Sequence, residues 1–303
     1  MRIRIALIAW AFLALGISAT PADVLYVATS SGVSVSADGG LHWTYDATVL
    51  GGLAGNRVLG LSVVGPTMYA ATWLGGLWIG GNGIWITYSR PVISANLLSV
   101  YVGGSDVYAC SLMGLWMSTN GGTTWTGTLQ NGGVVVNRVT TAGSTIFAAT
   151  NGAGLALSND GGRTWKSYLG TNGVADVCVS GSTIYVATQP VPGGVGGGLW
   201  VSTDAGSHWS QFLANTLLQS VYAVGATIYA ASDTALLIST DRGQTWKSTL
   251  AGRGVRRIAL EGSTTYAASS SGVWDSTDGG STWANWTTSN GLSSNDVYDL
   301  AAQ

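Results

Sequence analysis

Few side chains in this chain of 303 residues could carry out acid–base, covalent or metal chemistry. The sequence contains two histidines, two cysteines and a single glutamate, Glu261, so aspartates supply almost every carboxylate. Hydrolysis of a glycosidic bond typically uses two carboxyl groups, about 5–5.5 Å apart for retention of configuration and about 6.5–9.5 Å apart for inversion. A catalytic pair in this chain would therefore include at least one aspartate, brought by the fold close to a second carboxylate.

Many of the aspartates belong to a repeated motif of the form Ser-x-Asp-x-Gly-x-Thr-Trp. In a turn, Asp or Asn accepts hydrogen bonds from nearby backbone N–H groups, the glycine can adopt a positive φ, and the tryptophan can bury a large apolar surface. The motif therefore predicts a structural turn between two strands. Its Asp or Asn positions are Asp38, Asn82, Asn120, Asp160, Asp204, Asp241 and Asp278. The copy at Asn82 lacks the serine and two further residues, so we expect a distorted turn there.

The spacing of the motif indicates a repeat architecture. Successive copies are 44, 38, 40, 44, 37 and 37 residues apart, close to the roughly 40–50 residues of a four-stranded propeller blade. Two further strand patterns precede each motif, but the first of them is missing before the first motif and appears instead at residues 296–303. The sequence therefore predicts an all-β, seven-bladed β-propeller of four-stranded antiparallel blades. Its ring would be closed by the C-terminal strand joining the N-terminal blade, which leaves no free sheet edge between blades.

The N-terminus has the features of an export signal. Arg2 and Arg4 precede an apolar run over residues 5–17 and then small residues, as in a secretory signal peptide. The alternative is a membrane anchor, but the run is shorter than the roughly 20 residues that span a bilayer. We therefore expect a signal peptide over residues 1–22, a propeller over residues 23–303, no membrane span after cleavage, and a secreted or periplasmic protein.

The charge of the chain argues against nucleic acid as a partner. Without Arg2 and Arg4, 10 basic residues face 14 acidic ones, a net charge of −4, whereas nucleic-acid binding needs a basic surface.

Cys110 and Cys178 fall in blades that are not adjacent, so we expect two buried free thiols. His42 and His208 precede motif tryptophans and are expected to be exposed turn residues. The sequence has no cofactor or metal motif, and neither a cofactor nor a metal is expected.

Candidate binding residues follow from propeller geometry. The loops from strand two to strand three share one face with the loops from strand four to the next blade, and the Asp motifs lie on the other face. The first face should carry the candidate ligand-binding residues Arg57, Trp73, Arg138, Arg253, Arg256 and Arg257, since arginine binds carboxylates in a bidentate manner and tryptophan can stack on a sugar. It should also carry Asp176, Asp233 and Asp296, the alternative catalytic residues.

A Gly-rich loop over residues 189–197 is longer than its counterparts. Recurring tryptophans in the third strands are expected to pack within the blades; they are Trp78, Trp116, Trp200 and Trp274.

The motif resembles the BNR/Asp-box repeat of sialidases, two-domain xyloglucanases, sortilin-type receptors and the photosystem II stability and assembly factors. The resemblance extends over residues 24–303 and implies a propeller without implying one function, because one fold hosts many functions. Sialidases are six-bladed and use three arginines, an Arg-x-Pro motif and a Tyr–Glu pair; Arg90-Pro91 does not fit, and Glu261 is expected on the other face. Xyloglucanases of this type have two propellers, whereas this chain has room for one. The assembly factors match in size, blade number and export.

Three functions remain compatible with the sequence. The first is a non-catalytic binding or scaffold propeller that recognises a protein assembly or a glycan, although the sequence does not identify that partner. The second is a glycoside hydrolase, similar to a sialidase or a xyloglucanase, or a lyase, that uses two of Asp176, Asp233 and Asp296. The third is a purely structural surface protein with a smooth face and a closed channel.

Overall fold

The computed structural model describes residues 24–45, 57–81, 84–88, 96–130, 133–170, 172–190 and 196–302, with segment 84–88 described by its backbone alone. Within this part of the chain, 27 strands and one short 3-10 helix, η1 (Thr288–Asn290), are present. The predicted signal peptide over residues 1–22, the motif residue Asn82 and the centre of the Gly-rich loop, residues 191–195, lie outside the described residues.

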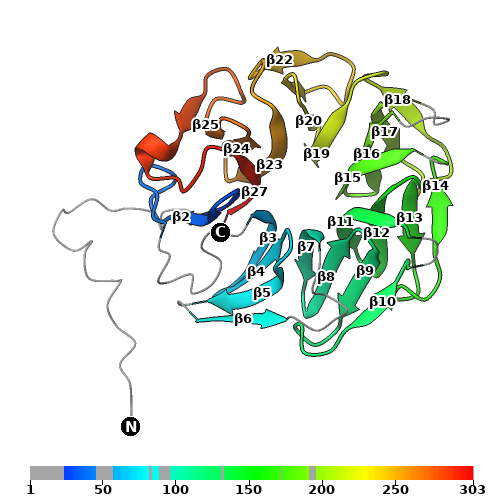
Figure 1. Ribbon diagram of the computed structural model, residues 1–303. Helices are drawn as coiled ribbons and strands as arrows, with labels where there is room; N and C mark the ends of the chain where they lie inside the picture. The colour runs from blue at the N-terminus through cyan, green and yellow to red at the C-terminus, as the bar shows by residue number, and fades with distance from the viewer. Residues whose placement is uncertain are drawn as a thin grey trace, which may run out of the picture.

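The strands form seven antiparallel sheets arranged as the blades of a ring (Figure 1). Each blade is numbered here from the sheet that contains β1, and its strands are given from the channel outwards. Blade one contains β27 (Val297–Ala302), β1 (Leu25–Thr29) and β2 (Gly32–Ser36); blade two β3 (Val58–Val64), β4 (Thr67–Thr72), β5 (Gly76–Gly81) and β6 (Ile84–Tyr88); blade three β7 (Leu97–Gly103), β8 (Asp106–Ser111), β9 (Gly114–Ser118) and β10 (Thr126–Thr128); blade four β11 (Val135–Ala142), β12 (Thr145–Asn151), β13 (Leu155–Ser158) and β14 (Lys166–Tyr168); blade five β15 (Gly173–Ser180), β16 (Thr183–Gln189), β17 (Gly198–Ser202) and β18 (Ser210–Phe212); blade six β19 (Leu218–Val224), β20 (Thr227–Ser232), β21 (Leu236–Ser239) and β22 (Lys247–Thr249); blade seven β23 (Val255–Glu261), β24 (Thr264–Ser269), β25 (Gly272–Ser276) and β26 (Ala284–Trp286).

Blade one closes the ring with strands from the two ends of the sequence. Strand β1 pairs antiparallel with β2 on one side and with β27 on the other, and Leu25 lies opposite Ala302. A bridge between Val35 and Thr44 stands where the other blades have their fourth strand. The predicted seven-bladed propeller and its closure by the C-terminal strand are therefore confirmed.

The hydrophobic core lies between the blades. Seven clusters of buried side chains each join two neighbouring blades; one of them packs Tyr69, Ala71 and Leu77 of blade two against Leu97 and Val100 of blade three. Strand two of every blade is buried over most of its length, which explains its apolar and small residues. The recurring tryptophans of the third strands pack against these clusters, as predicted.

The Asp motifs form nearly identical turns in the six copies that the structure describes. In each turn, the serine hydroxyl donates to Oδ1 of the Asp or Asn at 2.7–2.9 Å, and Oδ1 also accepts from a backbone N–H four residues later at 2.8–2.9 Å. The serine hydroxyl itself accepts from the glycine N–H at 2.8 Å. The turn is thus held by its own polar groups. The histidine side chains of two turns, His42 and His208, are 86% and 90% exposed, as expected.

The innermost strand of every blade contains a β-bulge at the same place. The register shifts around residue 59 in β3 and around the equivalent residue of each other innermost strand. We call these seven positions the bulge residues: Leu59, Leu98, Asn137, Ala175, Gln219, Arg256 and Tyr298. All seven are half-buried, and each follows a fully buried valine or leucine. Bulges re-aim side chains and are common next to functional sites.

Both cysteines are free. Cys110 is buried in strand two of blade three, and Cys178 is half-buried in strand one of blade five. Burial raises the pKa of the Cys110 thiol to about 12 and that of Cys178 to about 11, so neither is a ready nucleophile at neutral pH. None of the helices in the described part of the chain is long and apolar enough to span a membrane.

Candidate binding site at the channel mouth

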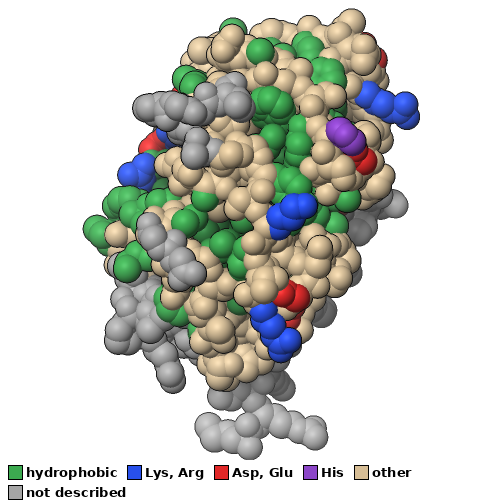
Figure 2. All heavy atoms as spheres, turned by 90° about the vertical axis from the view of Figure 1, so that its right-hand side faces the viewer, with side chains coloured by type: hydrophobic (Ala, Val, Ile, Leu, Met, Phe, Trp, Pro, Cys, Tyr) green, Lys and Arg blue, Asp and Glu red, His purple; other side chains and the backbone are tan. Residues whose placement is uncertain are grey.

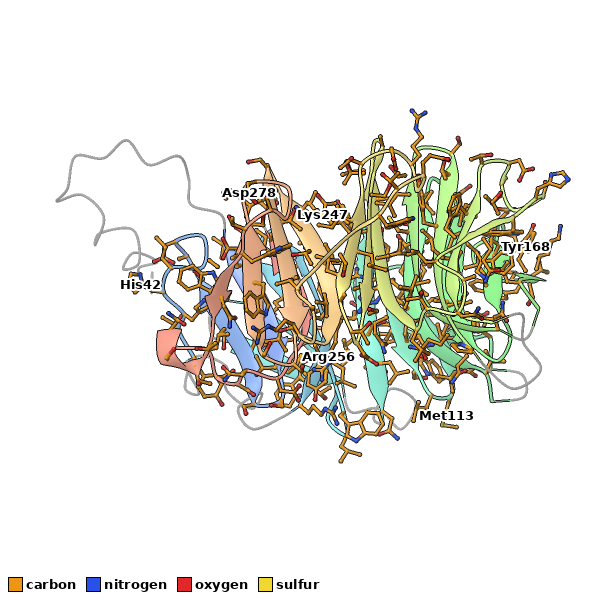
Figure 3. The ribbon with its side chains drawn as sticks, turned by 90° about the horizontal axis from the view of Figure 1, so that it is seen from above. His42, Met113, Tyr168, Lys247, Arg256 and Asp278 are labelled. Carbon is orange, nitrogen blue, oxygen red and sulfur yellow. The ribbon has the colours of Figure 1, made fainter. Side chains whose placement is uncertain are left out.

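The two faces of the propeller carry different elements. The Asp-motif turns share one face with the hairpins between strands one and two, because Gly121 N donates to Ser105 O and Arg242 N donates to Ala226 O. The loops between strands two and three lie on the other face, which we call the mouth face. Figure 3 shows Asp278 near one face, with Arg256 and Met113 near the other.

Four charged side chains meet inside the channel, one residue beyond the bulge in their strands. Arg138 Nε lies 3.6 Å from Asp176 Oδ1, and Arg138 Nη1 lies 3.4 Å from Asp299 Oδ2. Arg257 Nη1 lies 2.7 Å from Asp176 Oδ2, and Arg257 Nε lies 3.3 Å from Asp299 Oδ1. This charged ring joins blades four, five, seven and one across the channel, and its charges balance.

The two aspartates of the charged ring also accept hydrogen bonds from neighbouring strands. Asp176 Oδ2 accepts from Ser220 Oγ at 2.7 Å and from Val221 N at 3.2 Å, both in the next blade. Asp299 Oδ2 accepts from Leu61 N of blade two at 3.1 Å. Innermost strands have an unpaired edge towards the channel, and these carboxylates satisfy N–H groups on that edge. Both aspartates are almost completely buried, and their oxygens are occupied.

A second polar cluster lies at the mouth of the channel around Tyr298. The Cζ atoms of Arg57 and Arg256 each lie 4.6 Å from the centre of the Tyr298 ring, a cation–π distance. Arg256 Nη1 donates to Asp296 Oδ1, and the Tyr298 hydroxyl donates to Asp296 Oδ2, both at 2.6 Å. Among the described residues, Arg57 has no ion-pair partner and is exposed. The cluster therefore combines two cations with one anion.

Neighbouring groups shift the pKa values of Asp296 and Tyr298 in this mouth cluster. Partial burial acts to raise the pKa of Asp296, but hydrogen bonds from Tyr298 and Arg256 and the charge of Arg57 hold it below its usual value. Burial and the hydrogen bond to Asp296 raise the pKa of Tyr298. Asp296 is therefore ionised and Tyr298 protonated at neutral pH, so the carboxylate is an acceptor already engaged by two donors.

Other predicted residues lie on the loops of the mouth face. Asp233 is exposed and accepts from Gln219 Nε2 at 3.2 Å, while Gln189 Nε2 donates to Gln219 Oε1 at 3.0 Å. The Arg253 guanidinium lies 4.9 Å from the centre of the Trp274 ring. The half-buried Trp73 donates its backbone N–H to Arg57 O at 2.9 Å, which ties its loop to the start of β3.

Large apolar side chains are exposed on the same face. Leu74 is 74% exposed in the strand two to strand three loop of blade two, and Met113 is 73% exposed in the equivalent loop of blade three. Leu217, just before β19, is 48% exposed. Scattered exposed apolar residues are normal, but two in equivalent loops of adjacent blades are typical of a binding surface, and Arg57, which lacks an ion-pair partner in the described part of the chain, lies on the same face.

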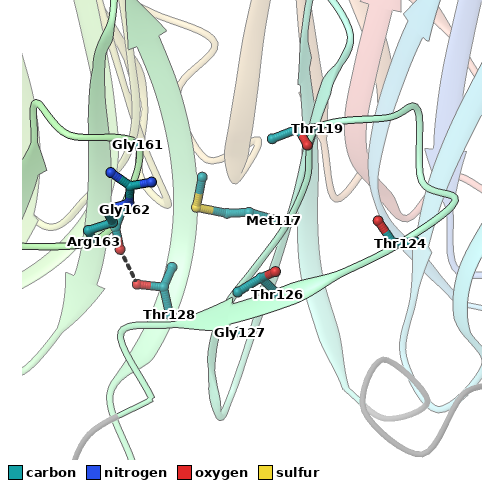
Figure 4. Close-up of a pocket in the computed structure, with 9 residues that line it drawn as sticks. All are labelled: Met117, Thr119, Thr124, Thr126, Gly127, Thr128, Gly161, Gly162 and Arg163. Atoms are coloured by element: carbon teal, nitrogen blue, oxygen red, sulfur yellow. Dashed lines mark hydrogen bonds between the residues drawn. The ribbon is translucent and has the colours of Figure 1, made fainter.

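The rim and the Asp-motif face have shallow grooves. One of about 460 Å³ lies between blades three and four and is lined by threonines, Met117 and Arg163, with Thr128 Oγ1 donating to Gly162 O at 2.7 Å (Figure 4). Another of about 580 Å³ lies beside the Asp204 turn. The rim around β14 and β18 shows few, well-separated charges among polar and apolar side chains (Figure 2). These grooves follow from the gaps between fanning blades.

The structure places the predicted residues in three groups. Arg138, Arg257 and Asp176 lie in the channel; Arg57, Arg256 and Asp296 at its mouth; Trp73, Arg253 and Asp233 on loops. Their roles in binding or catalysis stay predictions.

Two further residues of this region, Tyr298 and Asp299, were not predicted from the sequence; both lie in the closing strand. A sequence pattern could have indicated Asp299, because Asp299 follows a valine by two residues, as do Asp176, Arg138 and Arg257. Within the described ranges, His, Cys, Asp and Glu do not gather into a group that could hold a metal ion.

Comparison with known proteins agrees with the β-propeller fold. The profile of the BNR/Asp-box repeat matches residues 237–248, which include the turn at Asp241. The chain is therefore a β-propeller with six described turns of one geometry, and one of these turns matches the BNR/Asp-box repeat. A search of curated protein sequences gives no match.

Solved structures with the same fold include binding proteins and enzymes. "YCF48 bound to D1 peptide" has a TM-score of 0.64 and 15% identity, over 82% of this chain and 90% of that one. YCF48 from Cyanidioschyzon merolae has a TM-score of 0.59 and 13% identity, over 79% and 88%. The GH74 xyloglucanase from Xanthomonas campestris has a TM-score of 0.67 and 17% identity, over 84% of this chain but 50% of the enzyme. At these identities the likeness establishes the fold alone.

Proposed function

We propose that this chain is a non-catalytic binding propeller that recognises an extended segment of a partner protein on its mouth face. The observation that carries the proposal is the exposure of Leu74 and Met113 in equivalent loops of adjacent blades, on the same face as Arg57, which has no ion-pair partner among the described residues. The Leu74 loop is hydrogen-bonded to Arg57 through Trp73. A surface of this kind suits a partner with apolar and acidic side chains.

The channel beneath the mouth supports binding at the surface. The charged ring crosses the channel just below the bulge residues, and its oxygens are occupied by arginine, serine and backbone donors. A partner segment would therefore lie across the mouth and contact the loops. The structure with a D1 peptide shows that a propeller of this fold can hold a peptide, and a protein partner for this chain is part of the proposal. We also propose export, on the signal-like residues 1–22 alone.

A glycoside hydrolase is the alternative, favoured by the fold shared with the xyloglucanase. Of its three candidate aspartates, Asp176 is buried and engaged by two arginines. Asp233 and Asp296 remain accessible, but they belong to blades six and one, and Asp296 is engaged by Arg256 and Tyr298. This alternative therefore depends on Asp233 and Asp296 acting together.

The test selects ligands from a random dodecapeptide display library against purified residues 23–303 and measures their binding by calorimetry. Binding that falls at least tenfold in Arg57→Glu, but not in Val224→Ser, would support the proposal. Val224 is a suitable control because it is 48% exposed at the end of β19, near the Asp-motif face. Failure to enrich any peptide, combined with release of reducing sugar from xyloglucan that is lost in Asp233→Asn and Asp296→Asn, would favour the hydrolase.

A further inference from the structure

The bulge residues share one structural place but differ in chemistry. Each follows a buried valine or leucine and precedes a residue of the inner channel, so the backbone around them is nearly the same in all seven blades. The residue before the bulge is always apolar, whereas the bulge residues are leucine, asparagine, alanine, glutamine, arginine and tyrosine. The fold requires the bulge but does not require any one of these side chains.

The bulge residues divide the mouth into two arcs. Leu59 and Leu98, in adjacent blades two and three, form an apolar arc. Gln219, Arg256 and Tyr298, in blades six, seven and one, form a polar arc. Between the arcs, Asn137 is committed to Val174 O at 2.7 Å, and Ala175 has a small side chain.

The apolar arc coincides with the exposed apolar loops. Leu74 belongs to blade two with Leu59, and Met113 belongs to blade three with Leu98. Blades two and three therefore carry apolar residues both in the exposed loop and at the bulge. The polar arc instead holds Arg256 and the Tyr298 hydroxyl, which are linked through Asp296.

We propose that the bulge residues are the specificity-determining positions of the mouth face. A bound segment lies across the mouth with an apolar side chain against Leu59 and Leu98 and with an acidic or amide side chain over Arg256. This inference rests on the proposed function and adds the amphipathic character and the orientation of the ligand. Covering a leucine side chain contributes enough free energy to change affinity by about tenfold.

The test compares ligand selection by two variants. Random dodecapeptides are selected against the wild-type chain, Leu98→Lys and the control Val224→Lys, and the selected sequences are compared. The proposal expects a position with an apolar preference in the wild type and the control. In Leu98→Lys, that position should change towards Asp or Glu by about tenfold, a gain that misfolding cannot produce.

Two results separate the failure of this inference from the failure of the proposed function. Peptides that bind the wild type and Leu98→Lys with the same apolar preference, while Arg57→Glu still weakens them, would overturn the role of the bulge residues and leave the binding function standing. No peptide enrichment against any of the three proteins would overturn the proposed function and this inference with it.

Discussion

At the scale of single residues, Asp176 links its own innermost strand to those of three other blades. Its neighbours are two arginines, a serine hydroxyl and backbone N–H groups, including Val177 N at 2.9 Å. Any change at this carboxylate therefore loses contacts that join blade five to blades four, six and seven. Its contribution is to hold innermost strands together across the channel.

Asp176→Asn should lower the free energy of unfolding by about 3 kcal/mol, because removing one partner leaves buried arginine charge uncompensated. Urea unfolding followed by circular dichroism would measure the change. The matched control is Asp233→Asn, whose exposed side chain predicts a change within about 0.5 kcal/mol. Equal effects in the two variants would contradict the structural role of the charged ring.

The Asp-motif carboxylates predict a specific dependence of stability on pH. Hydrogen bonds from Thr164, His208 and Thr245 lower the pKa of Asp160, Asp204 and Asp241, respectively, to about 2. Because these pKa values lie below the ordinary value of 3.8, their stabilisation is present above pH 4 and is lost as the pH falls through about 2. The melting temperature should therefore fall between pH 4 and pH 2.

A triple variant in which Asp160, Asp204 and Asp241 become Asn should flatten this dependence. Asn120 shows that Asn is tolerated, because its Oδ1 accepts from Ser118 Oγ and Thr124 N at 2.9 Å. Scanning calorimetry at several pH values would compare the variant with the wild type. An unchanged slope of melting temperature against pH would show that other carboxylates control acid stability.

At the scale of elements, close approach of the innermost strands limits the residues that the channel accepts. A Cβ atom on Gly60 would lie 2.7 Å from Ser99 Cα and 3.1 Å from Val100 N of the neighbouring blade. Backbone atoms cannot move aside as a flexible side chain can, so the close approach of β7 to β3 requires glycine at residue 60.

Gly60→Ala should therefore destabilise the chain by about 2–3 kcal/mol, as expected for overpacking. Gly121→Ala is a useful comparison, because Gly121 has a φ of +66° but a Cβ atom added to it would meet nothing within 4 Å. Its expected cost is about 1 kcal/mol from backbone strain. Denaturant midpoints of the two variants would test this order, and the reverse order would refute the close approach.

The elements also show what the sequence could and could not predict. The Asp-motif turns were predictable because each depends on residues close in sequence. The bulges were not, since a one-residue shift in pairing leaves no local signature around Leu59 or Leu98. The predicted group at the mouth was therefore split, with Arg138 and Asp176 one residue deeper in the channel and Arg57 and Arg256 at its entrance.

At the scale of the whole molecule, ring closure depends on blade one. Its described part has three strands and the single bridge between Val35 and Thr44, and its innermost strand supplies Asp299 to the charged ring. Closure therefore combines β-pairing with ion pairs that reach blades four and seven. Asp299, in the closing strand, thus holds Arg138 and Arg257 of two other blades.

Blade one should be the first part of the ring to open. Hydrogen–deuterium exchange followed by mass spectrometry should show faster exchange in β1 and β2 than in β20 and β21, because blade six has four paired strands. Asp299→Asn should increase exchange in β1 and β27 by at least severalfold. Uniform exchange over blades one and six would indicate that the ring opens only as a whole.

We propose that the mouth face holds a segment of a partner protein. The most direct measurement is photocrosslinking of a library-selected dodecapeptide that carries benzoylphenylalanine, with the attachment sites located by mass spectrometry. Attachment is expected within the strand starts and loops of the mouth face, around residues 57–60, 72–76, 96–99, 111–114, 254–257 and 296–299. Attachment concentrated in the Asp-motif turns, such as residues 160–164 or 204–208, would contradict it.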